Sequence, residues 1–189
     1  MGGTVKSIET RRLTIRLPQI ADVPEVIRYY QENRIHLQPF SPAFAPDFLE
    51  TATWLEQVGV RARELEAGDS FRAFLFERDS AVRILGNINL TQVQRGAFHS
   101  CVLGYNLAAA EQGKGYMTEA VNGAVAFAFG VWNLHRVAAS YMPRNSRSAA
   151  VLQRCGFRID GRAPAYLFIN GRWEDHVLTS ITNPEWSPA

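Results

Sequence analysis

Two glycines flank a lysine directly before a long apolar segment, in the stretch EQGKGYMTEA at residues 111–120. Glycine lets a backbone approach a ligand closely and adopt left-handed dihedral angles. If a helix begins here, its first N–H groups have no partner inside the helix, and with the helix dipole they attract anions. The pattern predicts an anion-binding loop, although a plain turn that starts a helix would look the same. The candidate residues are Gln112, Gly113, Lys114, Gly115, Tyr116 and Met117.

Two common nucleotide-binding patterns do not fit this loop. A Walker A loop needs Gly five residues before Gly113 and Ser or Thr after the lysine, where the chain has Ala108 and Gly115. A Rossmann fingerprint needs a third Gly three residues after Gly115, where the chain has Thr118. The sequence therefore excludes both readings of the phosphate loop.

A second group of candidate residues begins at Asn145, which can cap a helix over 145–154 that also carries Ser148. Arginines gather in this region, and they form either a solvated face or a rim that binds anions. These arginines are Arg144, Arg147, Arg154, Arg158 and Arg162.

Hydrophobic periodicity predicts the elements that must position these residues. Strands are expected at 11–17, 70–77, 82–90, 98–107 and 136–142, and helices at 22–33 with Asp22 as the cap, 50–66, 117–132 and 145–154. Asn170-Gly171 predicts a hairpin with a two-residue turn, in which Phe168 would pair with Trp173 and Tyr166 with Asp175. We predict one α/β domain over residues 1–189 with a largely antiparallel sheet.

Composition narrows the classes of protein. With 189 residues, 47% apolar and 20% charged, the chain suits one globular domain, and a net charge of +2 is too small to indicate nucleic-acid binding. Cys101 and Cys155 lack metal or redox spacing, so we expect reduced, buried thiols in a cytoplasmic protein. The four histidines show no zinc spacing, and we predict no metal. No signal peptide or membrane span is expected.

Two segments in order resemble the cofactor segments of the GCN5-related N-acetyltransferase (GNAT) superfamily. The first is Gln112-x-x-Gly115, followed by Met117 where the family has Gly or Ala, and the second is NSRSAAVLQRCGF at 145–157. The stretches YYQENRIHLQPF, RGAFHSCVLGYNL, YMPRNSRSA and INGRWEDHVLTSITNPEW are similar to the RimJ group of ribosomal-protein-alanine N-acetyltransferases. The resemblance implies the GNAT fold, with a mixed, mostly antiparallel, seven-stranded twisted sheet and about four helices.

The resemblance also implies direct acetyl transfer from acetyl-CoA to the N-terminal alanine α-amine of a small-subunit ribosomal protein, by a monomer or homodimer. Backbone N–H groups from Gln112 to Met117 would hold the pyrophosphate. Tyr105, Asn106 and Leu107 would pair with the pantetheine arm as an added strand does. Asn145 matches the position whose side chain contacts that arm.

The resemblance assigns the catalytic residues less completely. Many family members stabilise the departing thiolate with a tyrosine, where this chain has Leu152. Ser148 matches a serine of the RimJ- and RimL-like groups, and it either donates to the sulfur or serves only the helix. Glu32 and Asp175 are candidate bases, or else structural or substrate-binding groups.

Three functions remain open at this point. The first is the alanine acetyltransferase described above. The second is the same fold acting on another amine, such as an antibiotic, a polyamine or a short peptide. The third is a CoA-binding ribosome-assembly module without turnover, because a fold does not fix a function.

Overall fold

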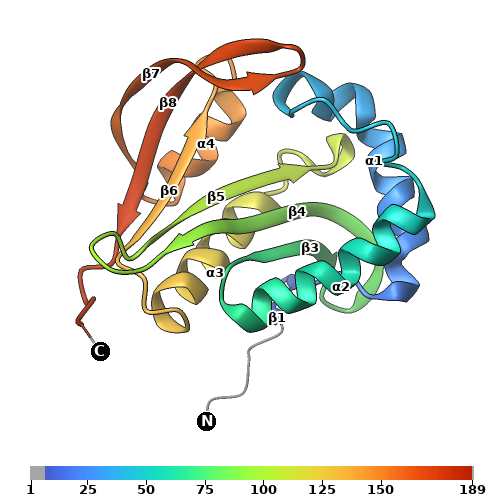
Figure 1. The fold of residues 1–189 in the computed structure, drawn as a ribbon, viewed down its shortest axis with the longest axis horizontal. Coiled ribbons are helices and arrows are strands. Elements are labelled where there is room, and N and C mark those ends of the chain that lie inside the picture. The colour runs from blue at the N-terminus through green and yellow to red at the C-terminus, as the bar shows by residue number, and fades with distance from the viewer. Residues whose placement is uncertain (1–6, 189) are drawn as a thin grey trace.

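The structure is a computed structural model that describes residues 7–188. Residues 1–6, which bear on the expected absence of a signal peptide, lie outside the described residues. Figure 1 shows a curved sheet with helices on both of its faces.

Within residues 7–188 the sheet has eight strands in the order β1-β2-β3-β4-β5-β6-β8-β7. The β5–β6 pair is parallel and the other pairs are antiparallel. The strands are β1 Ser7–Glu9, β2 Leu13–Arg16, β3 Phe71–Glu77, β4 Ser80–Gln94, β5 Ser100–Leu107, β6 Arg136–Tyr141, β7 Arg158–Ile169 and β8 Arg172–Thr182. The mostly antiparallel α/β fold is confirmed, but the predicted number of seven strands is wrong. The additional strand, β1, has three residues and one apolar side chain, too few to show alternation.

The helices cover both faces of the sheet and build two cores. The α-helices are α1 Val23–Leu37, α2 Thr51–Ala67, α3 Tyr116–Gly130 and α4 Ser146–Arg154, and the short 3-10 helices are η1 Ile20–Asp22, η2 Gln38–Phe40 and η3 Ala109–Glu111. Phe74 and Phe76 of β3 pack with α1 and α2 on one face. Ala73 and Leu75, their neighbours in the strand, pack in the core that α3 and α4 join on the other face. This alternation follows from the two-residue period of a strand.

Helix α3 is buried as its apolar composition predicts. Seven of its residues are buried, and they are Met117, Ala120, Val121, Ala124, Val125, Phe127 and Ala128. Cys101 and Cys155 are free and buried, and their burial was expected.

Two local predictions are wrong. Asp22 does not cap α1 with its side chain, because its carboxylate accepts from Arg16 (2.6 Å) and from the Gln19 N–H (2.7 Å). In the hairpin, Phe168 pairs with Trp173 as predicted, but a bulge between Ala163 and Leu167 prevents the expected pairing of Tyr166 with Asp175. Instead, Asp175 Oδ1 accepts from the Ala165 N–H (2.8 Å), and the Tyr166 ring lies 5.7 Å from the His176 ring.

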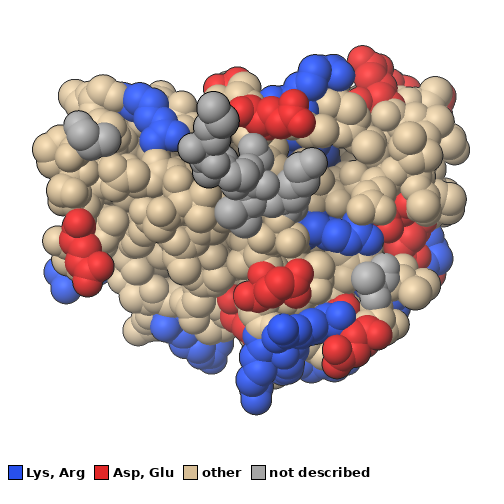
Figure 2. Space-filling model, turned by 90° about the horizontal axis from the view of Figure 1, so that it is seen from below, with Lys and Arg blue, Asp and Glu red and all other residues tan. Residues whose placement is uncertain are grey.

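Charge is mixed over the surface that Figure 2 shows. Acidic and basic side chains of the described residues are interspersed there, with broad uncharged areas between them. A surface that binds nucleic acid would typically show a stripe of positively charged side chains instead.

In residues 7–188, no helix is both long and apolar enough to cross a bilayer. The same residues contain no group of three or more His, Cys, Asp or Glu that could hold a metal ion.

Candidate functional site

The predicted anion-binding loop connects β5 to α3. Gly113 and Gly115 have φ values of 78° and 81°, in the left-handed region where glycine is favoured. Gly115 is the N-cap of α3 and offers no side-chain cap. The bond from the Glu119 N–H to the Gly115 carbonyl (3.1 Å) opens the helix, so the N–H groups of residues 116–118 precede the intrahelical ladder. These donors, together with the positive end of the helix dipole, suit a phosphate group.

The side chains of the loop contribute less than its backbone. Lys114 Nζ is paired with Glu111 (2.8 Å), whose carboxylate also lies 3.5 Å from Arg83, so the lysine charge is already balanced. Met117 is only 5% exposed and packs in the core. Its larger side chain, where the family has Gly or Ala, therefore points away from the surface of the loop.

An ion pair from the start of the chain supports the loop, and sequence reasoning did not find it. Arg12 Nη1 donates to the Lys114 carbonyl (2.9 Å), and Arg12 Nε donates to Glu119 in the first turn of α3 (2.7 Å). Thr10 Oγ1 donates to the same carboxylate (2.7 Å). Burial would raise the pKa of Glu119, but hydrogen bonds from Thr10 and Arg12 outweigh it and hold the pKa below its usual range. More than a hundred residues separate the partners, so no local pattern reveals the contact.

The neighbouring strands β5 and β6 separate beside this loop. They pair in parallel from Ser100–Arg136 to Leu103–Ala139, and the pairing ends there, as their divergence in Figure 1 shows. Residues 104–107 of β5 pair only with β4 on the other side. Their second backbone edge is therefore available to an extended polar chain, in the manner of an added strand.

Helix α4 places the second group of candidate residues against this edge. Asn145 caps α4, and its Oδ1 accepts from the Ser148 N–H (3.1 Å), as predicted. Ser148 Oγ lies 2.9 Å from Tyr105 Oη of β5, where either hydroxyl can donate, and the Ser148 carbonyl lies 3.2 Å from Tyr105 Oη as an alternative acceptor. Burial raises the pKa of the Tyr105 phenol. Leu152, where many family members have tyrosine, is buried in the core.

Helix α1 is joined to β5 and the loop from the opposite face of the sheet. Three contacts recur every three or four residues along the helix. Tyr29 Oη donates to Asn106 Oδ1 (2.6 Å), and the Ala109 N–H donates to Asn33 Oδ1 (2.9 Å). One turn further on, His36 Nε2 lies 2.9 Å from Gln112 Nε2. The spacing matches one face of a helix. The position of α1 is therefore mechanically linked to the segment that would hold the cofactor.

The structure does not bring the two candidate bases together with Ser148. Glu32 is paired with Arg28 on the exposed side of α1 (2.7 Å), and Asp175 holds the bulge of the hairpin through Ala165. Among the described contacts, neither carboxylate reaches Ser148. Both remain candidates for substrate binding or proton transfer.

The tip of the β7–β8 hairpin contacts the chain that follows α1, as Figure 1 shows. Gln38 Nε2 donates to Asn170 Oδ1 (3.2 Å), and Arg144 donates to the Pro39 carbonyl (3.3 Å) and to Glu174 (2.6 Å). Arg144 is thus engaged in an ion pair, so it is less available for the anion-binding rim. These contacts hold the tip of the hairpin against the chain that follows α1.

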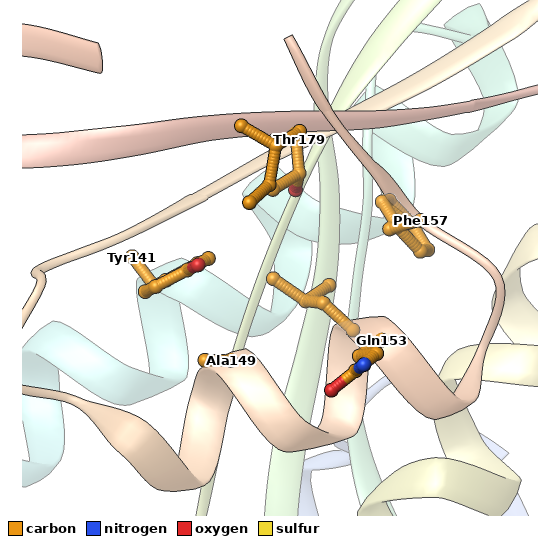
Figure 3. Close-up of a pocket in the computed structure, with 7 residues that line it drawn as sticks. Tyr141, Ala149, Gln153, Phe157 and Thr179 are labelled. Atoms are coloured by element: carbon orange, nitrogen blue, oxygen red, sulfur yellow. The ribbon is translucent and has the colours of Figure 1, made fainter. Parts of the chain in front are cut away.

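A cavity of about 300 Å³ lies beside α4, and Leu152 is among the residues that line it. Figure 3 shows Tyr141 and Thr179 facing Ala149 and Gln153 of α4 across it, with Phe157 at one end. The lining is uncharged, so the cavity does not suit the phosphates of a cofactor. The glycine loop remains the place for them.

Comparison with known proteins assigns this arrangement to a family. The model of the family described as "Acetyltransferase (GNAT) domain" matches residues 12–158. The chain belongs to the GNAT acetyltransferases. It is therefore an N-acetyltransferase that uses acetyl-CoA, and the loop, the separated strands and α4 are the segments expected to bind that cosubstrate.

Individual relatives agree over nearly the whole length. The Escherichia coli "[Ribosomal protein uS5]-alanine N-acetyltransferase" is 39% identical, over 96% of this chain and 93% of the relative. A crystal structure of the ribosomal-protein-S5-alanine acetyltransferase from Vibrio fischeri has a TM-score of 0.91 at 35% identity, covering 97% of this chain and 100% of that one. Mycobacterium smegmatis RimJ in complex with CoA-disulfide has a TM-score of 0.88 at 26% identity, covering 99% and 91%.

Proposed function

We propose that this protein acetylates the N-terminal alanine of ribosomal protein uS5, by direct transfer from acetyl-CoA. The observation that carries the proposal is the extent of the likeness to the Escherichia coli enzyme, which spans 96% of this chain. It therefore includes the acceptor side of the molecule, formed by α1, its following loop and the β7–β8 hairpin, as well as the acetyl-CoA segments.

The gap between β5 and β6 sets where each substrate would lie in the proposed reaction. The pyrophosphate binds the N–H groups of the loop, and the pantetheine arm pairs with the free edge of residues 104–107 on β5. The thioester then lies between β5 and β6, close to Ser148. The peptide amine approaches from the side bordered by α1 and the hairpin, where Asp175 adds a negative charge that attracts a positively charged N-terminus.

Ser148 is the residue that we assign to the leaving group. As the C–S bond breaks, negative charge builds on sulfur, and a hydroxyl aimed at it acts mainly in the transition state. Ser148→Ala should therefore lower kcat by roughly 10- to 100-fold, about 1.4–2.8 kcal/mol, with little change in KM. A folded variant with kcat within twofold of wild type would leave Ser148 as a helix residue only.

The energetics of the acceptor favour an N-terminus over a lysine. A free α-amino group has a pKa of about 8 and a lysine about 10.4, so neutralising them at pH 7 costs about 1 and 4–5 kcal/mol respectively. Water or a weak base such as Glu32 or Asp175 suffices for the first. The absence of a strong base among the contacts described here is compatible with an α-amine substrate.

A substrate comparison tests the function. Purified protein is given acetyl-CoA and three acceptors: a peptide with the uS5 N-terminal sequence beginning with alanine, the same peptide with its α-amine blocked and a lysine added, and spermidine. Release of free CoA thiol is measured. We expect turnover of the first peptide and little of the others. Faster turnover of spermidine would favour a polyamine substrate, and binding of acetyl-CoA without any thiol release would favour a non-catalytic module.

A further inference from the structure

We propose that Tyr105 is a positioning residue for acetyl transfer, whose hydroxyl donates to Ser148 Oγ and leaves the Ser148 hydrogen directed at the thioester sulfur. The inference rests on the proposed function, because it adds a residue to the same site. From the sequence, Tyr105 is expected to act only through its backbone, whereas this inference concerns its side chain.

The hydrogen-bond geometry gives Ser148 a defined partner. Tyr105 Oη lies 2.9 Å from Ser148 Oγ, a contact in which either hydroxyl can donate, and 3.2 Å from the Ser148 carbonyl. The phenol has one hydrogen, which we assign to Oγ because Oγ is the nearer of the two oxygens. A serine hydroxyl carries one hydrogen and otherwise rotates freely or bonds to its own helix. When Oγ accepts from the phenol, the serine hydrogen is left to serve another acceptor.

Tyr105 also stands where such a group is needed. It belongs to residues 104–107 of β5, which pair with β4 alone and leave their other edge to the cosubstrate. Its phenol reaches from that strand to the first turn of α4. Because burial raises its pKa, the phenol stays protonated at neutral pH and can serve as a donor.

The step balances without a proton leaving either hydroxyl. The amine nitrogen forms a bond to the thioester carbon, the C–S bond breaks, and its electron pair goes to sulfur. The proton of the amine leaves to water or to a weak base. Ser148 stabilises the thiolate by a hydrogen bond, and the donation from Tyr105 strengthens that bond, because hydrogen bonds in a chain polarise one another. Tyr105 itself does not contact the sulfur.

Tyr105→Phe tests this role because it removes the hydroxyl and keeps the ring. With acetyl-CoA and the alanine-starting uS5 peptide, we expect kcat to fall roughly 3- to 10-fold, less than for a direct donor to the developing charge. The KM values for both substrates should stay unchanged. Tyr141→Phe is the matched control, because it removes a tyrosine hydroxyl near α4 that makes no hydrogen bond to Ser148 among the described contacts, and it should keep the wild-type kcat.

The decisive measurement is the double variant. If Tyr105 acts through Ser148, then Tyr105→Phe combined with Ser148→Ala should be no slower than Ser148→Ala alone. An equal additional loss of kcat would overturn the inference, as would a folded Tyr105→Phe protein with wild-type kcat, or one in which only the KM for acetyl-CoA changes. A wild-type protein that turns over no amine would instead remove the proposed function, and the inference with it.

Discussion

Gly115→Val probes the anion-binding loop at the residue that starts α3. Gly115 has a φ of 81°, and a left-handed conformation costs an L-residue about 1–2 kcal/mol, more when the side chain is β-branched. A Cβ at this position would also lie 3.4 Å from Arg12 Nη2, part of the ion pair that supports the loop. We therefore expect the variant to relieve strain by moving the N–H groups that would bind pyrophosphate.

Two thermal shifts separate stability from binding. For a chain of this size, each kcal/mol changes the melting temperature by about 2–4 °C, so the unliganded variant should melt about 2–8 °C lower. Acetyl-CoA at a hundred times its Kd stabilises the wild type by about 2.7 kcal/mol, or about 5–11 °C. A tenfold loss of affinity would reduce that shift by about half, because it removes about 1.4 kcal/mol.

Gly68→Val is the matched control for this measurement. Gly68 ends α2 with a φ of 74°, and a Cβ there would meet no atom within 4 Å. The control should show a comparable loss of melting temperature but the full shift on addition of acetyl-CoA. If Gly115→Val also kept the full shift, the loop would not be the pyrophosphate site.

Three further changes test other parts of the site. Glu119→Gln should make the free energy of unfolding depend less on pH in acid. Because the pKa of Glu119 is lowered in the folded protein, its stabilising contribution is complete above the unfolded pKa of about 4.5 and is progressively lost as pH falls below it. Urea denaturation between pH 3 and 7 measures this, and an unchanged pH dependence in acid would contradict it. Asn33→Ala should cost about 0.5–1.5 kcal/mol, because it removes the hydrogen bond that the Ala109 N–H donates to Asn33 Oδ1, and should raise the KM for acetyl-CoA; wild-type values of both would show that α1 does not position the loop. Asp175→Asn should raise the KM for the peptide but not for acetyl-CoA, and two unchanged KM values would remove the hairpin from the acceptor site.

Local sequence patterns predicted the elements but not their long-range partners. Asn145 and its helix could be recognised because a cap residue and the N–H that donates to its side chain lie three residues apart. The Asn170-Gly171 turn likewise identified the hairpin, although the bulge beyond it shifted Tyr166 and could not be foreseen from alternation. By contrast, the contact of Tyr105 with Ser148 joins a strand and a helix 43 residues apart, and it depends on how α4 lies on the sheet.

The two faces of the sheet divide the chemistry of the proposed reaction. Ser148 and its partner Tyr105 lie on the face covered by α3 and α4, whereas Glu32 and Asp175 belong to α1 and to the hairpin that contacts the end of α1. An amine that attacks from the α1 side releases its proton there, while the sulfur departs toward α4. Under the proposed function, the proton and the sulfur would leave on opposite faces of the sheet, so the separation of Glu32 and Asp175 from Ser148 is compatible with direct transfer through the gap between β5 and β6.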